Sequence, residues 1–244
     1  MRRRGGEAVA EAAHDFRPFS PLHGVTVAVC ALAIVAICVA GLRVRGTTRE
    51  RTLRRALGVF GLAFWVVHQV YWLLPANFVW SRSLPLHICD VAGLLAPLAM
   101  LTSVRVLRTM TYFWGLALSI QGFITPVITE GPGTFIFWAF WIAHAINVGY
   151  AIFDFVAGGF VVRGRDLLIA IGISWGYCAF LFALNIPTGW NYGYVGDVQT
   201  SQPTLADAMG PWPLRALLVA LAGTAGLVLA WLPWGVRVRL SRER

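Results

Sequence analysis

Ionisable and nucleophilic side chains interrupt several long apolar runs of this chain. One run begins with His87, Cys89 and Asp90, an earlier run carries His68, and a later run carries His144. An ionisable group inside an apolar span costs a few kcal/mol and is by default a functional candidate. An imidazole that takes the proton of a thiol makes the sulfur a nucleophile. The same residue types also bind zinc, although no HExxH or HxxxH pair occurs. Thiol chemistry is therefore our first hypothesis, and metal binding is an alternative.

Membrane helices must position these residues. The 244 residues are 58% hydrophobic and 13% charged, whereas a soluble domain is about 25% charged. The apolar runs have the length of roughly 20 residues that a bilayer requires. This composition predicts an all-α, polytopic membrane helix bundle, and it excludes a soluble globular domain, a disordered chain and a coiled coil. We expect about seven transmembrane helices, over residues 24–42, 56–74, 85–103, 110–128, 135–158, 167–185 and 214–234.

The arginines predict the orientation of this bundle. All 20 basic residues are arginine, and most follow the first, third and fifth predicted helices or lie near the C-terminus. The positive-inside rule then places the N-terminus outside and the C-terminus in the cytoplasm. We expect an extracytoplasmic N-terminal tail (1–23), a membrane domain (24–234) with a long outer loop (186–213), and a basic cytoplasmic tail (235–244). The protein would be a multi-pass protein of the cell membrane.

The charge and cysteine content exclude several other functions. The net charge of +9 follows from membrane orientation, so nucleic acid is not an expected partner. The absence of lysine excludes a Schiff base with retinal or pyridoxal. None of the four cysteines lies in a CxxC pair, and all four lie in apolar segments. We therefore expect no structural disulfide, no zinc ribbon and no cofactor.

The rise of 1.5 Å per residue predicts that His68, His87, Cys89 and His144 meet in the outer half of the bundle. At 100° per residue, His87 and Asp90 share one helix face, whereas Cys89 points elsewhere. His87 is therefore a poor base for Cys89 within one helix. His144, on another helix, is the best-placed base.

Further polar residues complete the candidate site. Asn147 follows His144 by three positions and could orient a ligand. Asn191 or Tyr192, in the long outer loop, could cover the site or donate a hydrogen bond to an oxyanion. Our predicted catalytic pair is Cys89 with His144. The predicted substrate-binding residues are His68, His87, Asp90, Gln121, Asn147, Asn191 and Tyr192.

The stretch LPLHIC at residues 84–89 resembles the transmembrane protein 164 family, which includes bacterial YwaF-like integral membrane proteins. The resemblance covers roughly residues 20–235 and continues through YFWG at 112–115, QGFITP at 121–126, His144 and NYGY at 191–194. It implies a seven-helix membrane protein. Animal members are described as acyltransferases that remodel ether phospholipids with polyunsaturated acyl chains. The resemblance implies a nucleophile at Cys89 and a partner histidine at His144.

Three functions follow as expectations. The first is a membrane lipid acyltransferase or acyl hydrolase in which Cys89 attacks and His144 is the base, with membrane lipids and a lipid acyl donor as partners. The second is a non-catalytic binder or permease for a lipid or small molecule, with a polar, histidine-lined cavity. The third is a metal-dependent membrane hydrolase.

Overall fold

The computed structural model describes residues 16–198 and 206–242, with side chains to residue 236. The predicted N-terminal tail lies mostly outside these residues, as do positions 199–205 of the outer loop and 243–244 of the C-terminal tail. The described residues are helical and loop-like, without strands. The helices are α2 (Pro21–Val44), α3 (Thr48–Leu73), α4 (Ile88–Thr102), α5 (Arg105–Phe113), the π-helix η1 (Trp114–Ser119), α6 (Gln121–Ile124), α7 (Phe135–Val156), α8 (Gly164–Thr188), the 3₁₀-helices η2 (Tyr192–Tyr194) and η3 (Asp207–Met209), and α9 (Leu214–Arg242).

Each of the seven predicted ranges contains helix, which confirms the all-α fold. In the described part of the chain, α2, α3, α7, α8 and α9 are long and apolar enough to cross a membrane. The 15 residues of α4 span only about 22 Å of the 30 Å hydrocarbon layer. The prediction of one continuous helix over 110–128 is wrong, because this range is divided into α5, η1 and α6.

The predicted start of the third helix, at residue 85, is also wrong. The helix α4 begins at Ile88, and His87 is its N-cap residue in an extended conformation. Side chains from distant segments hold the extended segment at residues 84–87, here called the strap, that precedes the helix. The Tyr177 hydroxyl donates to the Leu86 carbonyl at 2.7 Å, and the Leu84 N–H donates to the Tyr192 hydroxyl at 3.0 Å. These contacts keep the strap extended, so the helical register begins three residues later than predicted.

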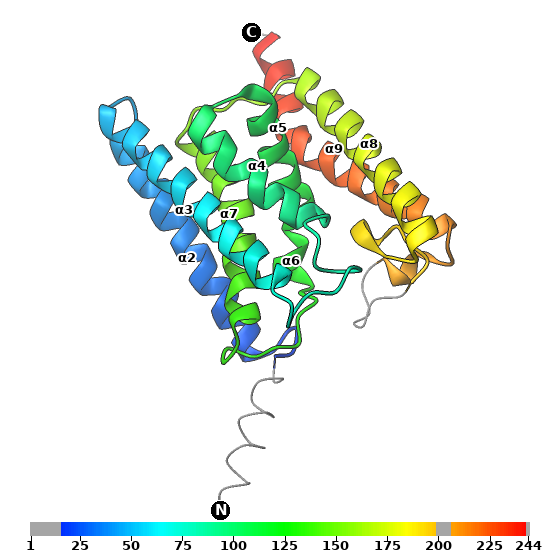
Figure 1. Cartoon of the computed structure of the whole chain (residues 1–244). Helices are drawn as coiled ribbons and strands as arrows, with labels where there is room; N and C mark the ends of the chain where they lie inside the picture. Colours follow the sequence, from blue (N-terminus) through cyan, green and yellow to red (C-terminus); the bar gives the residue numbers. More distant parts are fainter. Residues whose placement is uncertain (1–15, 199–205, 243–244) are drawn as a thin grey trace, which may run out of the picture.

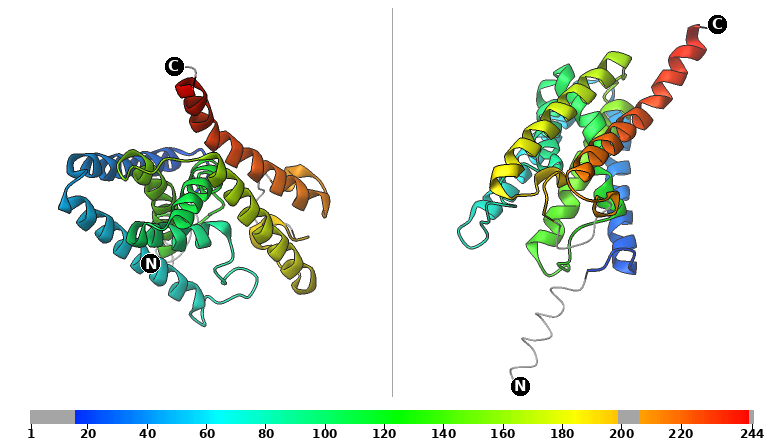
Figure 2. Two further views of the ribbon diagram at one scale, coloured as in Figure 1. Left: turned by 90° about the horizontal axis from the view of Figure 1, so that it is seen from above. Right: turned by 90° about the vertical axis from the view of Figure 1, so that its right-hand side faces the viewer.

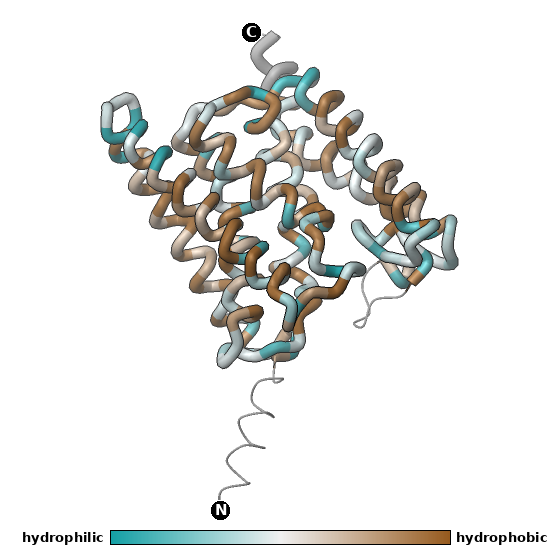
Figure 3. Tube along the Cα trace, in the orientation of Figure 1, coloured by the Kyte–Doolittle hydropathy of each residue, from teal (hydrophilic) through white to brown (hydrophobic). Residues whose placement is uncertain are grey.

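The helices form a central group with a pair on either side (Figure 1). The helix α7 is central and packs against α2, α4, α5 and η1, while α3 packs against α4. The helices α8 and α9 pack against each other and lie on the opposite side of the molecule from α2 and α3 (Figures 1 and 2). Hydrophobic residues predominate along the helices, and hydrophilic residues gather at several of the turns (Figure 3).

The arginine-rich turns lie at one end of the bundle, the upper end in Figure 1. Ion pairs formed by two buried carboxylates hold the helices together there. Asp154 of α7 accepts from Arg54 of α3 and from Arg108 of α5, each at 2.7 Å. Asp166 of α8 pairs with Arg105 of α5 at 2.5 Å. This end therefore agrees with the predicted grouping of the arginines, and it separates Asp154 from the candidate site. The orientation of this end toward the cytoplasm stays a prediction.

Candidate functional site

A cavity of about 670 Å³ lies between the helices and extends to the loop residues 82–83 and 127–130, at the end of the bundle opposite the arginine-rich turns (Figure 1). Its walls come from α3, α4, η1, α6, α7, α8 and α9, from the η2 and η3 segments, and from these loops. The volume lies in the range of small-molecule sites, about 300–1,000 Å³. Of the residues predicted from the sequence, six line it: His68, His87, Cys89, Asp90, Gln121 and His144. The structure thus brings residues from four separate segments to the same cavity as Cys89, the predicted nucleophile.

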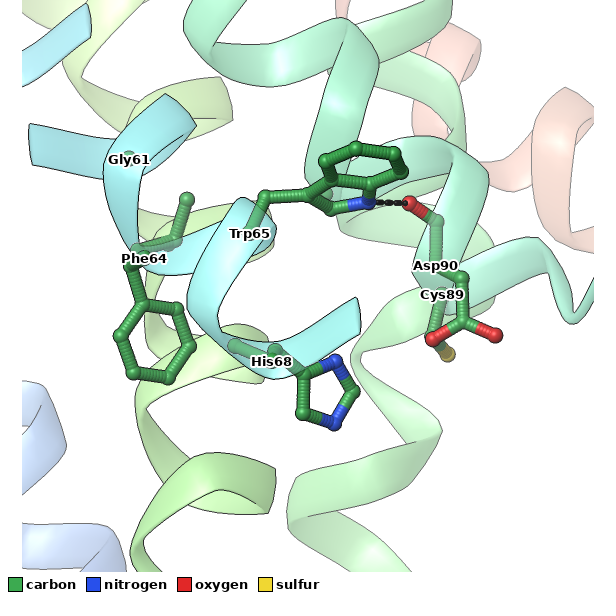
Figure 4. Close-up of a pocket in the computed structure, with 9 residues that line it drawn as sticks. Gly61, Phe64, Trp65, His68, Cys89 and Asp90 are labelled. Carbon is green, nitrogen blue, oxygen red and sulfur yellow. Dashed lines mark hydrogen bonds between the residues drawn. The ribbon is translucent and has the colours of Figure 1, made fainter. Parts of the chain in front are cut away.

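Cys89 is the second residue of α4 and faces the cavity from the first helical turn. The first amides of a helix lack intrahelical partners, so they can stabilise a negative charge beside the helix N-terminus. Asp90 helps to define this end of the helix, because its backbone N–H donates to the His87 carbonyl at 2.9 Å. The Trp65 indole of α3 donates to the Asp90 carbonyl at 2.8 Å. Figure 4 shows the Cys89 sulfur and the Asp90 carboxylate on the side of α4 toward which His68 extends.

The expected angular separation of His87 from Cys89 is wrong. Both residues line the same cavity, because His87 has an extended backbone with ψ of 146° and is not part of the helical register. Its ring lies against two tyrosines, at centroid distances of 5.0 Å from Tyr192 and 5.9 Å from Tyr194. These aromatic contacts connect the start of α4 to the segment that follows α8.

His144 lies on α7 and is almost completely buried, with 6% of its surface exposed. Its Nδ1 is 2.8 Å from the Phe140 carbonyl. A carbonyl can only accept, so Nδ1 carries the proton and Nε2 is left with a lone pair in the neutral ring. The ring edge with Nε2 lies against Gly122 of α6, where an added Cβ would collide with it. His144 therefore presents a proton-accepting nitrogen at the wall that it shares with α6.

His68 lies near enough to His144 for the two rings to interact electrostatically. The Trp72 indole donates to Nε2 of His68 at 3.1 Å, so this nitrogen is already occupied. His68 also borders a small recess that it shares with Cys89 and Asp90 (Figure 4). The position of His68 suits the binding of a polar group better than it suits proton transfer through Nε2.

Asn147 is buried in the helix bundle and is not part of the cavity wall. Its side-chain amide is completely buried and donates to the Cys89 carbonyl at 3.0 Å and to the Ser119 hydroxyl at 3.4 Å. The Ser119 hydroxyl also interacts electrostatically with the Cys89 thiol. Ser119 is not among the site residues predicted from the sequence. Spacing alone could not have found it, because η1 interrupts the regular helix in this region.

The outer-loop residues have different positions from those we expected. Tyr192 is completely buried, and its hydroxyl donates to the Trp80 carbonyl at 2.7 Å. Asn191 donates to Val198 and accepts from Gly196. Neither residue is in the cavity wall, whereas Tyr194 is. These contacts give Asn191 and Tyr192 a structural role in shaping the segment.

Tyr194 lines the cavity but is not among the site residues predicted from the sequence. It has a left-handed backbone with φ of 62°, which is uncommon and costly for a non-glycine residue. Its phenol lies near enough to Cys89 and Asp90 to interact with both electrostatically. Burial raises the pKa of Tyr194, so the phenol stays neutral and keeps its O–H as a donor. The NYGY stretch contained a signal for this residue, but its distance from Cys89 depends on the fold.

A metal centre would need three or more ligands within reach of one point. Among residues 16–198 and 206–242, no group of three His, Cys, Asp or Glu side chains has that arrangement.

Comparison with known proteins gives one family. The sequence profile of the TMEM164 family matches residues 18–231, which is most of the chain. No curated protein and no solved structure matches the chain. The matched range includes the LPLHIC stretch at residues 84–89, the residues that line the cavity, and His144. It confirms the resemblance predicted from the sequence motifs. The chain belongs to the TMEM164 family.

Proposed function

We propose that this protein is a membrane enzyme that transfers or hydrolyses the acyl chain of a lipid, with Cys89 as the nucleophile and His144 as the general base. The observation that carries the proposal is that both side chains line one large cavity. An acyl chain needs a long apolar space, and an ester needs polar groups at its end. The second requirement matches the polar residues around the start of α4.

The chemistry divides into two steps. In the first step, the Cys89 sulfur attacks the ester carbonyl carbon, and Nε2 of His144 takes the thiol proton. The carbon–oxygen bond then breaks, and His144 returns the proton to the leaving alcohol, which leaves a thioester on Cys89. In the second step, water or the hydroxyl of an acceptor lipid attacks the thioester, and the sulfur leaves as the thiol.

Two sets of donors are available for the negative charge that develops on the carbonyl oxygen. The first set is the backbone amides at the start of α4, which lack helical partners by geometry. The second is the phenol of Tyr194, which lines the cavity and is neutral. Tyr194 replaces our earlier candidates Asn191 and Tyr192 in this role, because their side chains are committed to other contacts.

The same proposal includes a location. The cavity extends to loop residues at the end opposite the arginine-rich turns, and the positive-inside rule puts that end outside the cytoplasm. We therefore infer a multi-pass protein of the cell membrane that takes lipid from the outer leaflet. The lipid partners are one acyl donor and, for transfer, one acceptor lipid.

A labelling experiment tests the nucleophile. The purified protein, in vesicles that contain phosphatidylcholine with an alkyne-tagged acyl chain, should acquire a tag that neutral hydroxylamine removes, as expected of a thioester. Cys89→Ala should abolish the tag. Cys178→Ala is the matched control, because Cys178 lines the same cavity from α8, and it should keep the tag. Tagging that persists in Cys89→Ala would refute the nucleophile, and lipid binding without any tag or product would favour a non-catalytic binder.

A further inference from the structure

We infer that Ser119 is a positioning residue for Cys89, held by Asn147, and that its hydroxyl donates a hydrogen bond to the sulfur as the thiol loses its proton. This inference rests on the proposed function, because it assigns Ser119 a role in activating the same nucleophile. The inference depends on three observations: the buried hydrogen bonds, the close approach of η1 to α7, and the place of Cys89 in the cavity wall.

The hydrogen bonds give the Ser119 hydroxyl a direction. Its oxygen accepts from the Asn147 amide at 3.4 Å, and the same amide donates to the Cys89 carbonyl at 3.0 Å, so the hydroxyl lies beside the first turn of α4. That bond does not use the hydroxyl hydrogen, and the hydroxyl interacts electrostatically with the Cys89 thiol. A hydrogen bond donated to a developing thiolate favours the charged form of the sulfur. Ser119 is completely buried, so water does not compete for this hydrogen.

Asn147 couples the hydroxyl to the backbone of α4. One amide carries both bonds, to the Cys89 carbonyl at 3.0 Å and to Ser119. The carbonyl acceptor determines which end of the side chain is nitrogen, since a carbonyl cannot donate. The position of the hydroxyl is therefore tied to the backbone of Cys89.

The local backbone is built for this contact. The serine is the last residue of the π-helix η1, and π-turns inside helices occur often at functional sites. Gly115 lets η1 approach α7 closely, because an added Cβ there would collide with the Asn147 carbonyl, only 2.5 Å away. A larger residue at position 115 would separate Ser119 from Asn147.

Other charged and titratable groups also face Cys89. Asp90 on the same helix and Tyr194 of η2 interact with it electrostatically. His68 of α3, His144 of α7, and Tyr177 and Cys178 of α8 share its cavity, as do the loop residues Arg82, His87 and Glu130. A test must therefore change the Ser119 hydroxyl alone, and compare variants that leave all these groups in place.

The experiment measures the rate at which N-ethylmaleimide alkylates Cys89 in the full-length protein in lipid vesicles, between pH 6 and 10. Mass spectrometry of the Cys89 peptide gives the rate, and the Cys178 peptide of the same sample is an internal reference. Ser119→Ala should slow alkylation of Cys89 roughly tenfold at neutral pH and move its pH dependence upward by about one unit. Ser119→Thr, which keeps the hydroxyl, should stay within about twofold of the unmodified protein.

Ser174→Ala is the matched control. This serine hydroxyl accepts from the Trp114 indole at the other end of η1, and its loss should leave Cys89 alkylation unchanged. An unchanged pH dependence in Ser119→Ala, an equal loss in Ser119→Thr, or a parallel change at Cys178 would each overturn the inference. Alkylation needs no lipid turnover, so failure of the proposed acyl chemistry would be seen separately in the thioester assay.

Discussion

The side chain of Asn147 in α7 donates a hydrogen bond of 3.0 Å to the backbone carbonyl of Cys89 in α4. The two residues are 58 positions apart, and the bond fixes the first turn of α4 against the helix that carries His144. The candidate nucleophile and the candidate base are therefore positioned by one buried amide. Four predictions follow from this arrangement and from the helices around it.

Gly122→Ala should displace His144. The added Cβ would collide with the Nε2 edge of the ring, and a misplacement of about 1 Å can cost roughly 100-fold in rate. We expect a comparable loss in the rate of thioester formation. Gly176→Ala on α8 is the matched control, because a Cβ there would meet no atom within 4 Å. Equal rates in the two variants would show that His144 is not required where the structure has it.

Tyr194→Phe removes only the phenol oxygen from the cavity wall. If this phenol donates to the oxyanion, its loss should lower turnover roughly 100-fold and leave the unfolding temperature nearly unchanged. Since burial raises the pKa of Tyr194, its ionisation should not appear in the rate profile below about pH 10. Tyr112→Phe is the control for turnover, because that hydroxyl donates to the Ala230 carbonyl and accepts from the Trp234 indole and is not part of the cavity wall. A rate unaffected by Tyr194→Phe would contradict the assignment.

Asp154→Asn should destabilise the arginine-rich end of the bundle. It leaves the guanidinium groups of Arg54 and Arg108, each 2.7 Å from the carboxylate, without their buried counter-charge. Breaking a buried pair by removing one partner costs about 3–5 kcal/mol, which thermal unfolding in detergent would measure. Glu50→Gln, at the exposed α2–α3 turn, should change stability by less than about 0.5 kcal/mol. A similar stability for both variants would mean that the ion cluster contributes little.

The predicted orientation can be tested with a pair of exposed cysteines. Ser81→Cys lies at the end with the cavity, and Thr48→Cys lies at the arginine-rich end; both positions are exposed. Neither change alters an arginine, so the positive-inside signal is preserved. With the four native cysteines replaced by alanine, a membrane-impermeant maleimide added to intact cells should label Ser81→Cys and should reach Thr48→Cys only after the cells are opened. The reverse pattern would invert the topology and place the cavity on the cytoplasmic side.

Much of the fold was accessible from the sequence, for a simple physical reason. A bilayer requires apolar segments of a set length, and arginines gather in the loops on its cytoplasmic side. Composition therefore predicted the helical membrane class, and the positions of the arginines predicted the grouping of the arginine-rich turns. The interruptions were less accessible. Neither the π-turn of η1 nor the extended strap before Ile88 has a periodic signal, since tertiary hydrogen bonds such as that of Tyr177 with Leu86 produce them.

The candidate site shows the same division. Residue type and depth along each helix predicted that Cys89, His144, His68 and His87 would occupy one end of the bundle, and they line one cavity there. Sequence position specifies depth but not the lateral arrangement of helices, which packing decides. Only the tertiary structure brought Ser119 beside the backbone of Cys89 and Tyr194, rather than Tyr192, to the cavity wall. Short-range contacts between segments distant in the chain determine those placements, and no spacing rule within one segment contains them.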